Sequence, residues 1–226
     1  FAIQDLLERQ PIFLDNQEVQ HQVAGKVILV TGAAGSIGSE IVHQLLAFSP
    51  KQLLLLDQAE TPLHHLCLEL SKVNSSCILT PLLVDVRDVS LVAHVFSRYQ
   101  PQLVYHAAAY KHVPIMETNA YQAVLTNVLG TKILADLAIK YQVASFVMVS
   151  TDKAVNPSNV MGASKRIAEL YVQSLFMQSQ SKTSRATKFI TTRFGNVLGS
   201  NGSVVPLFTK QIQEGGPITI THPDII

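Results

Sequence analysis

Residues 26–38 read KVILVTGAAGSIG, an apolar run followed at once by glycines at positions 32, 35 and 38. The apolar run predicts a strand that is buried on both faces. Glycines between a strand and a helix permit a tight turn, close approach of the backbone to a pyrophosphate, and close packing of the helix on the strand. The start of the helix also favours negative charge. We therefore predict a dinucleotide-binding loop with contacts from Gly32, Gly35, Ser36, Ile37 and Gly38.

The alternation of apolar runs and helical patterns continues beyond this loop. We predict further strands at residues 53–57, 77–85, 103–106, 145–150 and 188–194. Helices are predicted from the loop to about residue 48 and at residues 60–73, 88–99, 121–141 and 162–178. Strands that are apolar throughout belong to a parallel sheet covered by helices on both faces. The predicted fold is therefore the doubly wound α/β (Rossmann) class.

The alternation of strands and helices ends on both sides of this region. Residues 1–25 are polar, helix-like at residues 3–9 and turned at Pro11, so we expect an N-terminal arm or linker. Residues 26–200 are predicted to be the NAD-binding domain, which also carries the catalytic residues. Residues 201–226, helical at 205–214, are expected to begin a small substrate-covering region. Because the first residue is Phe and the last segment looks unfinished, we expect a part of a longer protein.

Composition narrows the function classes. The 226 residues are 47% hydrophobic, which is enough for one sizeable core, and the net charge is +1 without any Lys/Arg run. We therefore expect neither nucleic acid nor an anionic membrane as a partner. No run approaches the roughly twenty apolar residues of a membrane span, so we expect no membrane contact by this segment. Cys67 and Cys77 lack metal or redox spacing, and no metal site is predicted. Self-association into a homo-oligomer is left open.

Acidic residues end the second and third predicted strands. Asp57 lies about 20 residues beyond the loop, where a carboxylate accepts hydrogen bonds from the adenosine ribose. A carboxylate there repels a 2′-phosphate, which favours NAD over NADP; a helix N-cap is the alternative. Asp85 and Val86 are expected at the adenine edge, unless they form a simple turn ahead of Asp88. Small residues suit close approach of the backbone to the cofactor at Ala107, Ala108 and Ala109.

Polar residues follow the fifth predicted strand as Thr151-Asp152-Lys153. The carboxyl ends of the strands are where open α/β sheets bind their ligands. A neighbouring carboxyl group and amine can act as acid and base near one carbon if burial and coupling shift their pKa values. A solvated loop is the alternative interpretation.

Five sequence motifs occur in the order in which they occur in a known protein family. They are residues 31–40 (TGAAGSIGSE), 85–88 (DVRD), 106–117 (HAAAYKHVPIME), 150–169 (STDKAVNPSNVMGASKRIAE) and 194–202 (FGNVLGSNG). From about residue 26 onward the sequence resembles extended short-chain dehydrogenase/reductases of the polysaccharide-biosynthesis branch, the nucleotide-sugar 4,6-dehydratases. The N-terminal arm is similar to the linker of the large membrane-anchored members. The resemblance therefore implies a cytoplasmic domain of a longer protein anchored in the inner membrane.

The resemblance also implies a reaction. Its expected substrate is UDP-N-acetylglucosamine, and its product is UDP-2-acetamido-2,6-dideoxy-4-keto-hexose, for surface polysaccharide or glycan biosynthesis. Tightly held NAD oxidises C4 transiently, water is eliminated across C5 and C6, and the hydride returns to C6. The resemblance implies that Asp152 is the acid for the C6 hydroxyl and Lys153 the base at C5. Thr151 is implied as a hydrogen-bond donor to the sugar.

One position departs from the common short-chain dehydrogenase pattern. A tyrosine usually stands four residues before a lysine, whereas this chain has Met161 before Lys165. Methionine cannot transfer a proton. The large dehydratases that the chain resembles also carry methionine here. The group that deprotonates the C4 hydroxyl stays open among Lys165, Asp152 and a water; we favour a water or Asp152, with Lys165 binding the nicotinamide ribose.

Four further residues are weaker candidates. Lys111 could neutralise a phosphate or touch the sugar, with a solvated loop lysine as the alternative. Asn127 is a poor helix former and could bond to the fourth strand. Asn196 is a candidate contact to the nucleotide-sugar. Arg193 either lies near that contact or forms a structural ion pair.

Two rival functions share the predicted fold and cofactor. The first is a nucleotide-sugar 4-epimerase, which oxidises C4 but eliminates nothing. The second is a non-catalytic NAD-binding module, for which Met161 is the best support. The Asp152-Lys153 pair and the missing tyrosine both favour the dehydratase over the epimerase.

Overall fold

A single parallel sheet organises residues 15–195, which form one compact unit. The computed structural model describes residues 16–180, 186–197 and 204–217. The strands lie in the order β3-β2-β1-β4-β5-β6, which is the doubly wound order with its switch point between β1 and β4. The predicted fold class is therefore confirmed. The strands are β1 (Val27–Thr31), β2 (Gln52–Asp57), β3 (Ile78–Leu83), β4 (Leu103–His106), β5 (Ser145–Thr151) and β6 (Lys188–Phe194).

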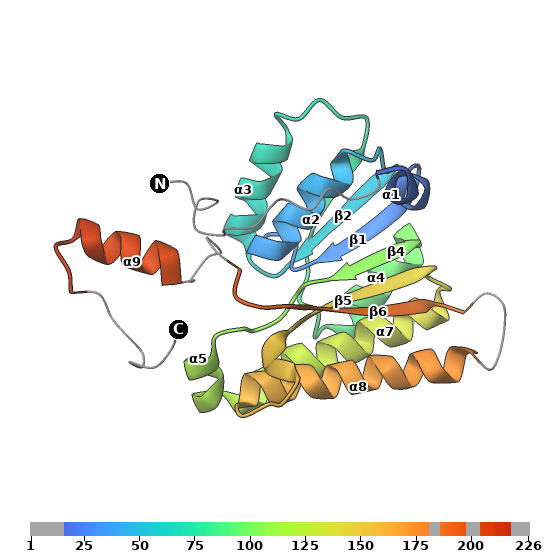
Figure 1. Ribbon diagram of the computed structural model, residues 1–226. Helices are drawn as coiled ribbons and strands as arrows, with labels where there is room; N and C mark the ends of the chain where they lie inside the picture. Colours follow the sequence, from blue (N-terminus) through green and yellow to red (C-terminus); the bar gives the residue numbers. More distant parts are fainter. Residues whose placement is uncertain (1–15, 181–185, 198–203, 218–226) are drawn as a thin grey trace. The chain divides into compact units, whose positions relative to one another are not determined.

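Helices cover both faces of this sheet (Figure 1). On one face, Ile28 and Val30 of β1 pack with the buried residues of α2 (Ser36–Leu46) and α3 (Glu60–Leu70). On the other face, Leu29 packs with α4 (Val89–Tyr99), α7 (Thr131–Lys140) and α8 (Val160–Gln180). Successive side chains of a strand point to opposite faces, so one continuous apolar run supplies both halves of the core. A short helix, α1 (Asn16–Val23), precedes β1.

The register of the strands shows where their carboxyl ends lie. Thr31 of β1 pairs with Leu56 of β2 and with His106 of β4. β5 pairs with β6 from its first residue to its last, Thr151. The loops after β1, β2, β4 and β5 therefore leave the sheet at one edge, where an open α/β sheet binds its ligand.

The helix predicted at residues 121–141 is continuous, but it is not α-helical throughout. It consists of α6 (Ala120–Ala123), a π-helical segment η2 (Val124–Gly130) and α7. The continuous helix at residues 120–140 is long and apolar enough to cross a membrane by length and composition, contrary to our expectation that no segment would be. Buried residues along it include Asn127, Leu134 and Ala138, so it serves as a core helix of this fold.

Other differences are smaller. The helix predicted at residues 60–73 ends at Leu70, and the strand predicted at residues 77–85 is limited to β3. A short helix, α5 (Val113–Thr118), was not predicted from the sequence. The helix and turn expected at residues 3–9 and Pro11 lie outside the described residues.

Residues 196–226 belong with residues 1–14 to a second unit. Its described part contains α9 (Val204–Gln213), close to the helix predicted at residues 205–214. The domain boundaries and the substrate-covering role of this region stay predictions. Within the described ranges, no group of His, Cys, Asp or Glu could hold a metal ion, and both cysteines are free thiols.

Candidate functional site: a dinucleotide cavity beside an Asp-Lys pair

The glycines of the loop after β1 are required by close backbone contacts. Gly32 has a φ of +65°, and a Cβ there would lie 2.6 Å from the backbone nitrogen of Ala108. A Cβ at Gly38 would lie 2.0 Å from the carbonyl oxygen of Gly32. Gly35 occupies the N-cap of α2. The absence of side chains thus lets α2 close onto the loop and lets the loop approach the end of β4.

A cavity of about 270 Å³ opens between this loop and the ends of β2, β3 and β4. We call it the dinucleotide cavity. Seven of the predicted cofactor contacts line it: Gly32, Gly35, Asp57, Val86, Ala107, Ala108 and Ala109. Its lining does not include the other predicted cofactor contacts, which are Ser36, Ile37, Gly38, Asp85 and Lys165. A side-chain-free cradle at the start of a helix suits a pyrophosphate, so the residues present fit a bound dinucleotide.

Asp57 joins the loop to β2. Its Oδ2 accepts a hydrogen bond of 2.9 Å from the backbone N–H of Ala34, and its Oδ1 accepts one of 3.0 Å from Ala59. The N-cap of α3 is Ala59 rather than Asp57. The carboxylate is therefore held at the wall of the cavity with lone pairs left for ribose hydroxyls, as the predicted role requires.

Asp85 forms an ion pair beside the cavity. Nε of Arg87 donates to both of its carboxylate oxygens, at 3.0 and 2.8 Å, and this contact holds the pKa of Asp85 below its usual range. Nη1 of Arg87 also donates a 2.8 Å bond to Gln122. Of the two residues predicted at the adenine edge, Val86 lines the cavity, whereas the carboxylate of Asp85 is held by a guanidinium.

The Thr151-Asp152-Lys153 triplet turns away from β5 in a short 3₁₀ helix, η3 (Asp152–Ala154). Oδ1 of Asp152 accepts hydrogen bonds from the Thr151 hydroxyl at 2.8 Å and from Nζ of Lys153 at 3.2 Å. The Thr151 bond and the neighbouring Lys153 hold the pKa of Asp152 below its usual value. The side chains of Asp152 and Lys153 are 55% and 38% exposed. With these contacts the carboxyl group of Asp152 is ionised, so it would have to gain a proton before it could act as an acid.

The first turn of α8 packs directly against this triplet. A Cβ at Gly162 would lie 2.4 Å from the carbonyl oxygen of Lys153, so glycine is needed for the contact. Met161, at the position of the usual tyrosine, is buried with Met116 and Ala123. Lys165 is buried too, and burial lowers its pKa to about 8. The predicted catalytic residues of β5, η3 and α8 are therefore gathered at one edge of the sheet.

Asn127 links the segment after β4 to α8. Its Oδ1 accepts a 2.8 Å bond from the N–H of Tyr110, and its Nδ2 donates to the Tyr110 carbonyl at 3.0 Å and to the Ser164 hydroxyl at 2.9 Å. The predicted bond to the fourth strand is thus made just beyond that strand, to the segment that also lines the cavity.

His106 is a central residue that the sequence analysis did not single out. Its Nδ1 lies 2.7 Å from the Thr31 hydroxyl and its Nε2 lies 2.8 Å from the Thr131 hydroxyl. Because Thr131 donates its hydrogen to the Asn127 carbonyl at 2.7 Å, it can only accept from His106. The proton is therefore on Nε2, and Thr31 donates to Nδ1. Burial lowers the pKa of His106 to about 3, which keeps the ring neutral.

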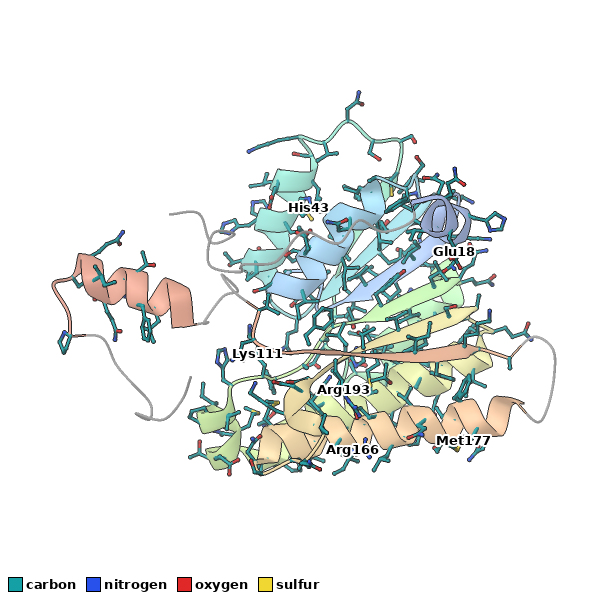
Figure 2. All side chains as sticks on the ribbon, in the orientation of Figure 1. Glu18, His43, Lys111, Arg166, Met177 and Arg193 are labelled. Atoms are coloured by element: carbon teal, nitrogen blue, oxygen red, sulfur yellow. The ribbon has the colours of Figure 1, made fainter. Side chains whose placement is uncertain are left out.

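The remaining candidates lie in different places. Arg193 binds Glu169 through two hydrogen bonds, at 2.9 and 2.7 Å, so the structural ion pair is the better interpretation of this residue. Arg166 of α8 donates to the same carboxylate at 3.2 Å. Arg166 and Arg193 are labelled in Figure 2. Lys111 is exposed on the segment that joins β4 to α5. Asn196 falls in the second unit, and its substrate contact stays a prediction.

Comparison with known proteins relates this site to polysaccharide biosynthesis. A sequence profile described as "Polysaccharide biosynthesis protein" matches residues 28–226. The chain is 50% identical, over 99% of its length, to the capsular polysaccharide biosynthesis protein CapD of Staphylococcus aureus. It is 46% identical, over 92% of its length, to the uncharacterized membrane protein MJ1061 of Methanocaldococcus jannaschii. The chain spans 37% and 60% of the lengths of these two relatives.

Two further relatives are named for reactions on nucleotide-sugars. The chain is 35% identical to the UDP-N-acetylglucosamine 4,6-dehydratase (inverting) of Campylobacter jejuni, over 88% of the chain and 58% of the relative. It is 36% identical to the UDP-glucose 4-epimerase of Rickettsia canadensis, over 88% of the chain and 57% of that relative. Both reaction types therefore occur among its relatives.

Solved structures share the fold. Pen from Bacillus thuringiensis matches with a TM-score of 0.80 and 36% identity, over 88% of this chain and 59% of Pen. The DesIV double mutant, a dTDP-glucose 4,6-dehydratase from Streptomyces venezuelae, was solved with NAD bound. It matches with a TM-score of 0.69 and 25% identity, over 84% of this chain and 63% of DesIV. A protein of the same fold thus holds the cofactor predicted from this sequence.

Proposed function

This chain belongs to the polysaccharide biosynthesis protein family, and we propose that it is the catalytic domain of an NAD-dependent nucleotide-sugar 4,6-dehydratase. The proposed substrate is UDP-N-acetylglucosamine, which the name of the Campylobacter jejuni relative supports. The observation that carries the proposal is the contact between Asp152 and Lys153 at the carboxyl end of β5. A reaction that only oxidises and reduces C4 needs no such pair.

The pair matches the needs of an elimination. When bound, the dinucleotide supplies a hydride acceptor for C4 and a hydride donor for C6. Between those steps, a base must remove the C5 proton and an acid must protonate the departing C6 hydroxyl. Transfer of one proton from Nζ of Lys153 to Oδ1 of Asp152 creates a neutral amine and a protonated carboxyl group together. These are the base and the acid that we assign to C5 and C6.

The exposure of Asp152 and Lys153 to water determines whether this proton transfer is favourable. Both side chains are partly exposed, and water stabilises the charged forms. A sugar that covers the pair removes this water and favours the neutral forms. The hydroxyl of Thr151 donates to Asp152, which stabilises the charged carboxylate and so opposes the proton transfer. If this hydroxyl turned to the sugar, the opposition would be removed. Substrate binding would thus prepare the acid and the base at the same time.

Heavy water distinguishes this reaction from epimerisation. The full-length protein would be incubated in D₂O with UDP-N-acetylglucosamine, and the product analysed by NMR. The dehydratase proposal expects a 4-keto product that has lost its C6 hydroxyl and carries solvent deuterium at C5. A C4 epimer with an unexchanged C5 proton would overturn it in favour of the epimerase, which the Rickettsia canadensis relative keeps as the second candidate.

We further propose that the chain is a cytoplasmic domain of a longer, membrane-anchored protein. It spans 37% of the length of CapD, and another relative is named as a membrane protein. Fractionation of cells that express the full-length protein tests this: we expect it in the membrane fraction, with the residues of this chain open to protease only from the cytoplasmic side. Recovery of the full-length protein in the soluble fraction would contradict the anchor.

A further inference from the structure

The carboxylate of Glu117 binds the start of a distant helix. Its Oε1 accepts a 2.7 Å hydrogen bond from the backbone N–H of Val160, 43 residues later in the sequence. Val160 is the first residue of α8, where backbone N–H groups have no partner within the helix. The helix dipole adds a favourable interaction with a carboxylate at this end. Glu117 therefore stabilises the first turn of α8 from another part of the fold.

This first turn also has a cap within its own segment. Oδ1 of Asn159 accepts a 2.8 Å bond from the N–H of Gly162, and the Asn159 carbonyl accepts one of 2.9 Å from Ala163. Bonds within one segment form the end of the helix, but they do not fix its position relative to other elements. Glu117 supplies that second constraint, because it belongs to α5, which lies beside the start of α8 (Figure 1).

A buried apolar cluster accompanies this hydrogen bond. Met116 precedes Glu117 on α5, and Met161 follows Val160 on α8. Both methionines are buried, and they belong to one cluster with Ala123. Two successive residues of α5 are thus joined to two successive residues of α8. At the position of the usual tyrosine, the methionine contributes packing that holds the helix in place.

The first turn of α8 lies directly against the proposed base. A Cβ at Gly162 would lie 2.4 Å from the carbonyl oxygen of Lys153, so the two backbones are in close contact. Closely packed interiors transmit small displacements. A shift of this turn would therefore move the backbone of Lys153, and with it the Nζ atom that lies 3.2 Å from Oδ1 of Asp152.

We propose that Glu117 is a positioning residue for the elimination, because by holding the first turn of α8 it keeps Lys153 and Asp152 in the geometry that proton transfer needs. This inference rests on the proposed function, which assigns those two residues as base and acid. Glu117 acts through the backbone of α8 and takes no part in the proton transfer itself. A displacement of about 1 Å at a reacting group can cost about 10²-fold in rate. Loss of Glu117 should therefore lower kcat rather than substrate affinity.

Three substitutions separate positioning from simple stabilisation of a helix. Glu117→Ala removes the acceptor and should lower kcat by about 10- to 100-fold, with KM for the nucleotide-sugar within about 2-fold of the wild type. Glu117→Gln keeps an oxygen that can accept from Val160, so it should restore kcat to within about 3-fold of the wild type. Asp88→Ala is the matched control. Asp88 caps α4 by accepting a 2.9 Å bond from Leu91, and its loss should leave kcat unchanged.

Hydrogen exchange gives a readout that does not depend on activity. The full-length protein and its variants would be incubated in D₂O without substrate, and the exchange of backbone N–H groups measured by mass spectrometry. We expect faster exchange at residues 152–163 in Glu117→Ala and wild-type exchange there in Glu117→Gln. In Asp88→Ala, the faster exchange should be confined to the first turn of α4.

The two readouts together decide the inference. Unchanged exchange at residues 152–163 in Glu117→Ala would overturn it, and so would faster exchange with a wild-type kcat. An equal loss of kcat in Asp88→Ala would overturn it as well, because the effect would then be one of helix capping in general. All three results leave the proposed function intact. A wild type that eliminates no water from UDP-N-acetylglucosamine would instead count against the proposed function, and with it against a positioning role.

Discussion

Nζ of Lys165 donates a 2.7 Å hydrogen bond to the backbone carbonyl oxygen of Val149, inside the sheet edge that carries the candidate catalytic residues. The lysine is 4% exposed. Burial lowers its pKa from 10.5 to about 8, and the charge of Glu169 offsets part of this effect. The fold therefore lowers the pKa of the Lys165 ammonium group to a value only slightly above neutral pH.

This burial should make stability depend on pH in a defined window. Between pH 8 and pH 10.5 the unfolded chain binds a proton at Lys165 that the folded chain has lost, so the free energy of unfolding rises with pH. Below pH 8 both states are protonated, and the contribution is flat. From pH 7.5 to pH 9.5 the gain from this residue should be about 2 kcal/mol. Urea denaturation at the two pH values measures it.

The matched variant is Lys165→Met, which keeps an unbranched side chain without the charge. Other groups, such as Cys67 and Cys77, titrate in both proteins and cancel in the comparison. The wild type should gain about 2 kcal/mol more than the variant between the two pH values. Equal gains in both proteins would show that the pKa of Lys165 is not depressed in the folded state.

A second prediction concerns His106, which lies between Thr31 and Thr131. Its lowered pKa, about 3, and its partners require a neutral ring with the proton on Nε2. In ¹⁵N NMR, Nδ1 should give the shift of an unprotonated nitrogen and Nε2 that of a protonated one, unchanged from pH 8 to pH 5. A short peptide that contains a histidine serves as the control, since an unperturbed imidazole titrates near pH 6.5. Titration of His106 near pH 6.5 would contradict the assignment.

The same burial makes stability rise with pH, as for Lys165, but in a lower pH window. Between pH 6.5 and pH 3 the unfolded histidine gains a proton and the folded one does not, so stability falls as pH falls. From pH 7 to pH 5 the loss from His106 should be about 2 kcal/mol. Comparison with His106→Gln by chemical denaturation isolates it, because the variant cannot take up that proton. A variant that loses as much as the wild type would exclude His106 as the source.

Much of the fold follows from local pattern. β4 has the predicted bounds, because a buried parallel strand leaves a short apolar run in the sequence. β6 also has its predicted bounds, although most of its residues are exposed at the edge of the sheet. The glycine loop can be predicted equally well, since its glycines stand at positions where a side chain would clash with neighbouring backbone atoms. β3 is shorter than its prediction because its hydrogen-bonded ladder with β2 covers only Ile78–Leu83.

The parts of the site that escaped prediction depend on contacts between distant residues. The bonds of His106 join residues 75 and 25 positions apart, and no local pattern reports such pairing. The π-helical geometry of η2 likewise accompanies a Thr131 hydroxyl bond to Asn127, on a segment whose apolar spacing predicts an ordinary helix. The ion pair that Arg87 forms with Asp85 was not predicted either, and the contact of Asp85 with the adenine edge stays a prediction.

A third prediction tests the assignment of Asp57 to the ribose. Asp57→Asn keeps the size of the side chain but removes the charge that repels a 2′-phosphate. We expect affinity for NAD to fall and the ratio of NAD to NADP affinity to drop by about 10-fold or more, measured by calorimetry. Glu60→Gln is the control, because it removes the same charge from an exposed position at the start of α3. An equal change of the ratio in both variants would indicate a general field effect instead of a ribose contact.

The final prediction separates elimination from cofactor binding. Lys153→Gln removes the amine that we assign as base, and Asp152→Asn removes the carboxylate that its Nζ meets at 3.2 Å. Each change should lower kcat by about 10²- to 10⁴-fold, the usual contribution of a proton-transferring group. NAD affinity should stay within about 2-fold, because neither residue lines the dinucleotide cavity.

The control for this prediction is another lysine paired with an aspartate. Lys132 contacts Asp136 on the exposed face of α7, and Lys132→Gln should leave both kcat and NAD affinity unchanged. Incorporation of solvent deuterium at C5 gives the sharper readout, since Lys153→Gln should abolish it even where C4 is still oxidised. If Lys153→Gln exchanged the C5 proton at the wild-type rate, another group would be the base, and the Asp152-Lys153 contact would no longer distinguish this reaction from an epimerisation.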